Sequence, residues 1–192
     1  MAIITHSCDD PRIVAALKAG QLVVAPTDTI YGILASAADP LAVDRLYCAR
    51  QRNRAKSCII LLDEVAAIPR LSSQQRRQYR QLMRQRPTTI AVPVDTQLLP
   101  HLVRTPEKTT STLAFRVVPP SSPLAAIIRR VGPLLAPSAN REGQPPATTI
   151  DEAVSYFGDR VAVYIDGGRI AQAQPSRIIS YTSDGELRLI RQ

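Results

Sequence analysis

Residues 22–32 read LVVAPTDTIYG, a short apolar run that passes directly into threonine, aspartate and glycine. Residues 134–140, LLAPSAN, have the same design, with serine and asparagine after the apolar run. A buried strand that ends in such residues presents hydroxyl groups, an amide and free backbone N–H groups at one edge of a sheet. Because open α/β sheets bind small ligands at that edge, the two segments predict a ligand site where two strands end.

The rest of the chain alternates between helical and strand patterns, with short turns between them. Strand-like runs occupy residues 22–25, 58–62, 90–94, 113–118, 134–136, 161–165, 176–180 and 187–190, the last two joined by a Ser183-Asp184-Gly185 turn. Helical patterns follow Asp10, Asp39 and Ser122, occupy residues 73–86, and follow a capping box at residues 149–152. This order predicts a single α/β domain over residues 1–192, with a twisted, mixed central sheet flanked by helices.

The composition bounds the compartment and the partners. The 192 residues are 45% hydrophobic, which is enough for one packed core. Lysine and arginine outnumber aspartate and glutamate by 24 to 16, and the formal charge of +8 favours a nucleotide or RNA as partner; a solvated basic surface is the alternative. The three cysteines form no Cys-x-x-Cys pair, and no apolar run approaches the roughly 18 residues of a membrane span. We therefore expect a cytoplasmic protein that makes no contact with membranes.

Several common catalytic motifs are missing from the sequence. It has no Gly-x-Ser-x-Gly elbow, no Walker loop, no Gly-x-Gly-x-x-Gly turn and no histidine–cysteine cluster with zinc spacing. Both histidines, His6 and His101, lie outside the dense motifs. Serine-triad hydrolysis, Rossmann redox chemistry and a resident metal site are therefore not expected. Positioning and electrostatic stabilisation remain, and these are the usual means of catalysing nucleotidyl transfer.

Residues 50–56, RQRNRAK, form a dense basic stretch between the two polar segments. Arg50 and Arg52 follow the end of a predicted helix and could both face one phosphate chain, since a guanidinium offers a bidentate fork to phosphate oxygens; a solvated helix end is the alternative. Lys56 could add a third cation or lie on the surface. Asp28 could bind a nucleotide-bound Mg²⁺ ion or cap its loop. Together these residues predict a site for a phosphorylated ligand.

Taken in order, short pieces of the chain resemble the YrdC family. They are PTDTIYG at 26–32, RQR at 50–52, TLAFR at 112–116, SAN at 138–140, DGG at 166–168, PS at 175–176 and Arg191. Their order and spacing over most of the chain make the match specific. The resemblance is to the short form of the family, which lacks an additional C-terminal domain.

This resemblance implies a threonylcarbamoyl-AMP synthase. Such members join L-threonine, bicarbonate and ATP into threonylcarbamoyl-adenylate with release of pyrophosphate, and the product supplies N6-threonylcarbamoyladenosine in tRNA. ATP would be a substrate with Mg²⁺, and no tightly bound cofactor is implied. The implied partners are tRNA-modification proteins, and contact of RNA with the basic face would fit the charge.

The resemblance also implies roles for individual residues. Thr27, Arg116 and Ser176 would hold threonine, with Arg116 facing the threonine carboxylate. Arg50, Arg52, Thr112, Ser138, Asn140 and Arg191 would surround ATP, and the basic stretch adds Lys56 to this set. Arg50 and Arg52 would be catalytic, because cations stabilise the charge that develops at the α-phosphorus.

The sequence departs from the family pattern at three places. Arg50 replaces the family lysine, Ser57 replaces a proline, and residues 85–89, QRPTT, lack the glycine of the family's P-G-P-x-T block. Arginine keeps the charge of lysine but not its compact ammonium geometry. Two other functions therefore stay open. One is a diverged paralogue that acts on a related carbamoyl-adenylate, and the other is a non-catalytic RNA-binding module based on the arginines of residues 76–86.

Overall fold

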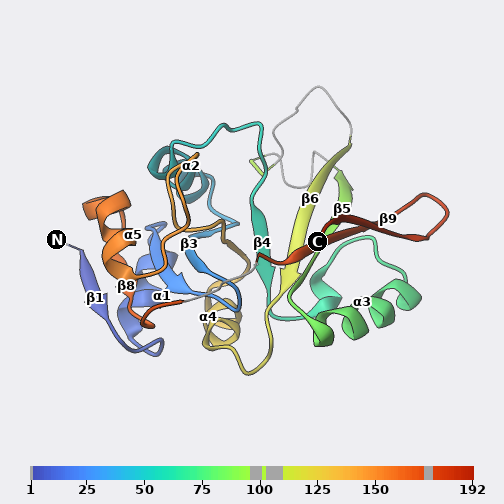
Figure 1. The fold of residues 1–192 in the computed structure, drawn as a ribbon, viewed down its shortest axis with the longest axis horizontal. Helices are drawn as coiled ribbons and strands as arrows, with labels where there is room; N and C mark the ends of the chain where they lie inside the picture. The colour runs from blue at the N-terminus through green and yellow to red at the C-terminus, as the bar shows by residue number, and fades with distance from the viewer. Residues whose placement is uncertain (1, 96–100, 103–109, 171–174) are drawn as a thin grey trace.

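The computed structural model describes residues 2–95, 101–102, 110–170 and 175–192. Within this part of the chain, ten strands form one mixed sheet, and helices pack on it as expected (Figure 1). In their order across the sheet, the strands are β1 (Ile3–Thr5), β8 (Val163–Ile165), β2 (Val23–Pro26), β3 (Tyr31–Ser36), β7 (Leu134–Leu135), β4 (Ile59–Leu62), β6 (Thr110–Val117), β5 (Thr88–Asp95), β9 (Arg177–Tyr181) and β10 (Leu187–Arg191).

The directions of the strands explain why the two polar segments meet. β1, β8 and β2 run parallel, whereas β3 is antiparallel to both β2 and β7. β7 is antiparallel to β4, β6 is parallel to β4 and antiparallel to β5, and β9 is parallel to β5. As a result Gly32, at the start of β3, forms an isolated bridge with Ser138, just after β7. The segments that the sequence singles out therefore lie side by side, as predicted.

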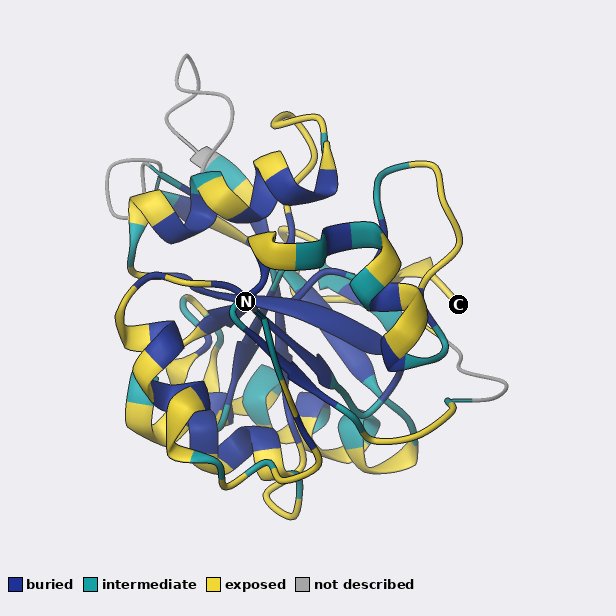
Figure 2. Ribbon diagram, turned by 90° about the vertical axis from the view of Figure 1, so that its left-hand side faces the viewer, coloured by how far each residue is buried: buried dark blue, intermediate teal, exposed yellow. Residues whose placement is uncertain are grey.

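Two apolar cores lie on opposite faces of the sheet. Consecutive strand residues point to opposite faces, so Val23 and Leu34 belong to one core and Val24 and Ile33 to the other. α1 (Pro11–Lys18) and α4 (Pro123–Val131) close the first core, and α2 (Pro40–Arg50) and α5 (Ile150–Phe157) pack on the second. Figure 2 shows the buried strands between helices whose outer faces are exposed.

The remaining helix, α3 (Ser73–Gln85), lies beside β5 and β9. The Tyr79 side chain of α3 is fully buried, and its hydroxyl donates to the Thr88 carbonyl at 2.7 Å. Two short 3-10 helices, η1 (Val65–Ala67) and η2 (Gly158–Arg160), complete the helical elements of the described residues. None of the helices that the structure describes has the length and apolar character needed to cross a bilayer.

Side-chain caps begin the helices. At α1, α2 and α4, the side chains of Asp10, Asp39 and Ser122 accept a backbone N–H, and proline occupies the first turn. At α5 the predicted capping box is wrong in one half. The Thr149 side chain accepts the Glu152 N–H, as a capping box requires. The Glu152 carboxylate, however, accepts the N–H of Thr148 at 2.7 Å and not that of Thr149. α3 begins instead with a complete box, in which Ser72 and Gln75 cap each other.

The sequence patterns do not predict β1 or β3. β1 has three residues and depends on its pairing with β8, so it is too short to carry a periodic pattern. All six residues of β3 are buried, so no alternation marks it. β5 and β6 begin before the expected strands at 90–94 and 113–118. Residues 90–95 of β5 pair with residues 110–115 of β6, and the first two residues of β5 pair with β9.

Candidate functional site

A cavity of about 380 Å³ opens where the two polar segments meet, a volume typical of small-molecule sites. Its lining comes from the β2–β3 connection, the end of α2 and the loop after it, β6, the residues after β7, and the stretch from Pro175 to Arg191. The polar lining side chains are Thr27, Thr29, Arg50, Arg52, Ser57, Arg116, Ser138, Ser176 and Arg191. Segments from both halves of the chain therefore converge on one space.

The cavity is cationic. Four arginines line it, and within the described residues the lining contains no aspartate or glutamate. Concentrated positive charge attracts anions, and guanidinium groups bind phosphate and carboxylate oxygens through paired hydrogen bonds. Arg52 and Arg116, which come from the loop after α2 and from β6, line the same space. This arrangement fits a ligand that carries more than one anionic group.

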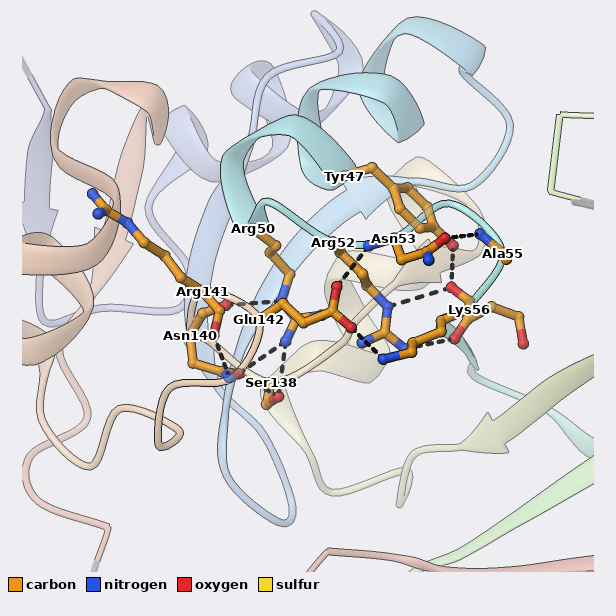
Figure 3. A network of polar contacts seen from close by, with 11 residues as sticks. Tyr47, Arg50, Arg52, Asn53, Ala55, Lys56, Ser138, Asn140, Arg141 and Glu142 are labelled. Carbon is orange, nitrogen blue, oxygen red and sulfur yellow. Dashed lines mark hydrogen bonds and ion pairs between the residues drawn. The ribbon is translucent and has the colours of Figure 1, made fainter.

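Arg50 is buried in the wall of the cavity. Its Nε donates to the Asn140 carbonyl at 3.0 Å, and its Nη2 donates to Asn140 Oδ1 at 2.9 Å and to Ser138 Oγ at 3.2 Å (Figure 3). Within the described residues its Nη1 is buried without a hydrogen-bond partner. Burial, and secondarily the charge of Arg52, lowers the pKa of Arg50 to about 10. Arg50 is therefore cationic at neutral pH, and its Nη1 is a donor that none of the described residues uses.

Arg52 lies in the loop that follows α2. Its Nε and Nη2 donate to the carbonyls of Lys56 and Ser57, at 3.3 and 3.1 Å. The loop thus folds back on the side chain of its own arginine, which is half-buried and lines the cavity. These bonds use one side of the guanidinium and hold it in a fixed orientation.

Arg116 occupies another part of the lining and is 4% exposed. Its Nη2 lies 3.0 Å from Asp28 Oδ1, and its Nη1 donates to Thr29 Oγ1 at 3.2 Å. Its Nε is buried and, among the described residues, has no hydrogen-bond partner. Burial lowers the pKa of Arg116, and the charge of Asp28 opposes that shift. Asp28 therefore serves as the counter-ion of this arginine.

Thr27 shapes the β2–β3 connection. Its hydroxyl donates to the Ile30 carbonyl at 2.7 Å and accepts the backbone N–H groups of Thr29 and Ile30. Such a hydroxyl-centred turn fixes a loop without help from a ligand. The turn also brings Gly32 close, because a Cβ on that glycine would lie 3.1 Å from Thr27 Cγ2.

Ser176 and Arg191 reach the cavity from the C-terminal hairpin. Ser176 Oγ lies 2.7 Å from Thr89 Oγ1, a contact that the parallel pairing of β9 with β5 brings about. Arg191 Nη2 donates to the Ser176 carbonyl at 2.8 Å. Both residues are among the lining, as their predicted roles require.

Three predicted site residues lie outside the lining. Asn140 is buried behind Arg50 and orients it. Lys56 makes an ion pair of 2.6 Å with Glu142. Thr112 is exposed on β6, on the same face as Ala114 and Arg116 but further from the cavity. The structure thus brings together seven of the ten predicted residues.

Sequence reasoning missed four residues of this region. Thr29 belongs to a quoted motif and could have been found there, because it lies two residues from Thr27. Cys58, which lines the cavity, begins a predicted strand and carries no polar signal. Thr89 and Glu142 reach the site only through tertiary contacts with Ser176 and Lys56, so no local pattern marks them.

Comparisons with known proteins agree with this picture. The Sua5/YciO/YrdC family model, described as "Telomere recombination", matches residues 15–192. A Mycobacterium tuberculosis protein, provisionally named threonylcarbamoyl-AMP synthase, is 36% identical over 93% of this chain and 85% of its own length. A threonylcarbamoyl-AMP synthase of Chromohalobacter salexigens is 32% identical over 91% of this chain and 94% of its own length.

Solved structures show the same fold. Escherichia coli YciO has a TM-score of 0.77 at 22% identity and covers 100% of this chain and 96% of its own. A variant of Sua5 from P. abyssi has a TM-score of 0.80 at 26% identity over 100% of this chain, which spans 59% of that longer protein. Because the family model matches nearly the whole sequence and the relatives exceed 30% identity, the chain belongs to the Sua5/YciO/YrdC family.

Proposed function

We propose that this protein is a threonylcarbamoyl-AMP synthase, a nucleotidyltransferase that uses L-threonine, bicarbonate and MgATP as substrates. The observation that carries the proposal is that Arg52 and Arg116 line one cavity. That cavity can hold a phosphate chain and an amino-acid carboxylate at the same time. The relatives are named as threonylcarbamoyl-AMP synthases, and this reaction combines an amino acid with a nucleotide.

The amino-acid end of the cavity centres on Arg116. Its buried Nε has no hydrogen-bond partner among the described residues and would bind the threonine carboxylate, while Asp28 and Thr29 hold the rest of the guanidinium. Thr27 and Ser176 line the same cavity and would contact the remainder of threonine. The threonine amine attacks the carbon of bicarbonate, a C–N bond forms, and water leaves to give the carbamate.

The phosphate end centres on the end of α2. Arg50, Arg52, Ser138 and Arg191 would surround the nucleotide, and Asn140 would act by orienting Arg50. A carbamate oxygen attacks the α-phosphorus of ATP, a P–O bond forms, and the bond to the β-phosphate breaks with release of pyrophosphate. Arg50 and Arg52 stabilise the negative charge that develops in this step. Because a carbamate and a mixed anhydride both hydrolyse readily, exclusion of water matters as well.

Mg²⁺ would enter as part of the substrate MgATP. Within the described residues, no group of three or more metal-ligating side chains is found, and the Asp28 carboxylate is paired with Arg116. Direct contacts of Lys56 and Thr112 with ATP stay predictions. We further propose that the protein acts in the cytoplasm and that tRNA-modification proteins consume the product.

The test is an assay of pyrophosphate release. The protein is incubated with ATP, Mg²⁺, bicarbonate and L-threonine, and then with each substrate omitted in turn. We expect release that needs all of them, together with an adenylate of the mass of threonylcarbamoyl-AMP. Release no greater than that of an ATP-only blank would contradict the proposal. An adenylate of different mass would identify a diverged paralogue instead.

The RNA-binding alternative loses part of its support in the structure. The Arg76 guanidinium donates to the carbonyls of Ala66, Ile68 and Leu71 at 2.6, 3.1 and 3.0 Å, so this residue of the basic helix anchors the preceding loop. RNA binding that persists at saturating ATP and threonine, in a protein without synthase activity, would favour this alternative.

A further inference from the structure

Glu142 joins two segments of the cavity wall that are far apart in the sequence. Its backbone N–H donates to the Arg50 carbonyl at 2.8 Å. One carboxylate oxygen accepts the Asn53 backbone N–H at 2.6 Å, and the other accepts the Lys56 ammonium at 2.6 Å. Glu142, two residues after the SAN motif, is thus tied to the end of α2 at Arg50. It is also tied to two positions of the loop formed by residues 51–57, which we term the basic loop (Figure 3).

The basic loop in turn holds Arg52. The carbonyl of Lys56 accepts from Arg52 Nε and from the Tyr47 hydroxyl, at 3.3 and 2.9 Å, and the carbonyl of Ser57 accepts from Arg52 Nη2. A displacement of the loop backbone at Lys56 would therefore displace the guanidinium that lines the cavity. Glu142 reaches that backbone through the Lys56 side chain and through Asn53.

The ion pair is too exposed to add much stability, since the side chains of Lys56 and Glu142 are 61% and 24% exposed. The ion pair matters because it helps to fix the position of the basic loop. The bonds from Lys56 and from the Asn53 N–H lower the pKa of Glu142, so the carboxylate stays charged at neutral pH and accepts both donors. The ion pair also engages the Lys56 ammonium group, which the sequence pattern assigns to the nucleotide.

We propose that Glu142 is a positioning residue that clasps the basic loop and aims Arg52 into the cavity, and that Lys56 acts through this clasp. The inference rests on the proposed function, because it assigns Arg52 to the phosphate chain. It departs from the sequence-based role of Lys56 as a direct ligand of ATP. Glu142 itself touches no substrate.

The first test is kinetic. Glu142→Gln keeps the size of the side chain but removes its charge, and we expect kcat/KM for ATP to fall about tenfold because Arg52 is no longer well placed. KM for threonine should stay unchanged. The matched control is Asp44→Asn, which removes the partner of Arg54 in a 2.6 Å ion pair from the same loop. The control should retain activity within about twofold.

A double-mutant cycle separates the two roles of Lys56. If Lys56 works through Glu142, Lys56→Met should cost little in the Glu142→Gln background, because the clasp is already broken. If Lys56 binds ATP directly, the losses from the two substitutions should multiply. Multiplying losses would overturn the proposal.

A second readout needs no substrate. The Asn53 amide donates to Glu142, so its hydrogen exchange in the unliganded protein should be about tenfold faster in Glu142→Gln and unchanged in Asp44→Asn. Unchanged exchange in Glu142→Gln would refute the clasp even if the synthase assay succeeds. Conversely, faster exchange in a protein without synthase activity would support the clasp and contradict only the proposed function.

Discussion

Arg116 Nη2 and Asp28 Oδ1 lie 3.0 Å apart, and both side chains are largely removed from solvent. Arg116 lies on β6 and Asp28 lies in the β2–β3 connection. Their ion pair therefore connects the middle of the sheet to the half that contains β2. A buried pair of this kind is strongly coupled, because either charge alone would be costly in this environment. Among the described residues the pair leaves the buried Arg116 Nε without a hydrogen-bond partner, and this is the donor that the proposed function assigns to the threonine carboxylate.

Removing one member of this pair should destabilise the protein more than removing both. Asp28→Ala should lower the free energy of unfolding by about 3 kcal/mol, because Arg116 is left without a counter-ion. The double variant Asp28→Ala/Arg116→Met should regain part of that loss. Urea denaturation measures both. A double variant as unstable as the sum of its single substitutions would contradict the coupling.

Arg52 should matter for turnover far more than its neighbour in the basic loop. We expect Arg52→Ala to lower kcat for pyrophosphate release about 100-fold, since the proposed function places this residue beside the developing phosphate charge. Arg54 is paired with Asp44 and is not part of the cavity lining, so Arg54→Ala serves as the control. Unchanged turnover in Arg52→Ala would remove this residue from the site.

Arg50 should not be replaceable by the lysine of the family pattern. Its guanidinium bridges Ser138 and Asn140 with three hydrogen bonds, and a single ammonium group cannot reproduce that fork. Arg50→Lys should lower the free energy of unfolding by about 2 kcal/mol, because buried acceptors lose their donors. Arg141→Lys, which affects a single bond to the Tyr156 carbonyl, is the matched comparison. Equal losses in the two variants would argue against a special role for Arg50.

Tyr79 should make stability fall at alkaline pH. Burial raises the pKa of Tyr79 to about 12, whereas an unfolded tyrosine ionises near pH ~10. The stabilisation is thus complete below about pH 10 and is lost as the pH rises toward 12, by at most about 1.4 kcal/mol per pH unit. Denaturation at several pH values should show a shallower slope for Tyr79→Phe than for the wild type. Identical slopes would show that Tyr79 does not titrate in this way.

Local patterns were sufficient for most of the fold. The caps at Asp10, Asp39 and Ser122 mark helix starts because capping is a contact between near neighbours. β1 was missed because it is short and pairs with β8, which is distant in the sequence, and β3 was missed because all six of its residues are buried and show no alternation. The strand order across the sheet is likewise a property of long-range pairing, which a single sequence does not display.

The site was predictable to the extent that its residues sit in short polar motifs. Thr27 and Ser138 each follow an apolar run, Arg116 lies within one, and the fold brings the three residues to one cavity. Lys56 was placed in the nucleotide site on charge alone. Its partner Glu142 lies 86 residues further along the sequence, so no local pattern indicates the ion pair. Asn140 was assigned to the ATP site, and in the structure its side-chain oxygen accepts from Arg50. Whether a side chain points to a ligand or to a neighbouring residue depends on its direction, which the sequence does not give.

The hairpin of β9 and β10 bears on how the protein is made. Ser176 and Arg191 join the cavity only through this hairpin, whose pairing partner β5 is synthesised much earlier. On the ribosome, a nascent chain that has not yet extended past β8 lacks the residues that form this wall of the cavity. ATP and threonine can stabilise only a state that binds them. Cellular metabolites would therefore protect the protein from proteases after translation of the hairpin, and not before.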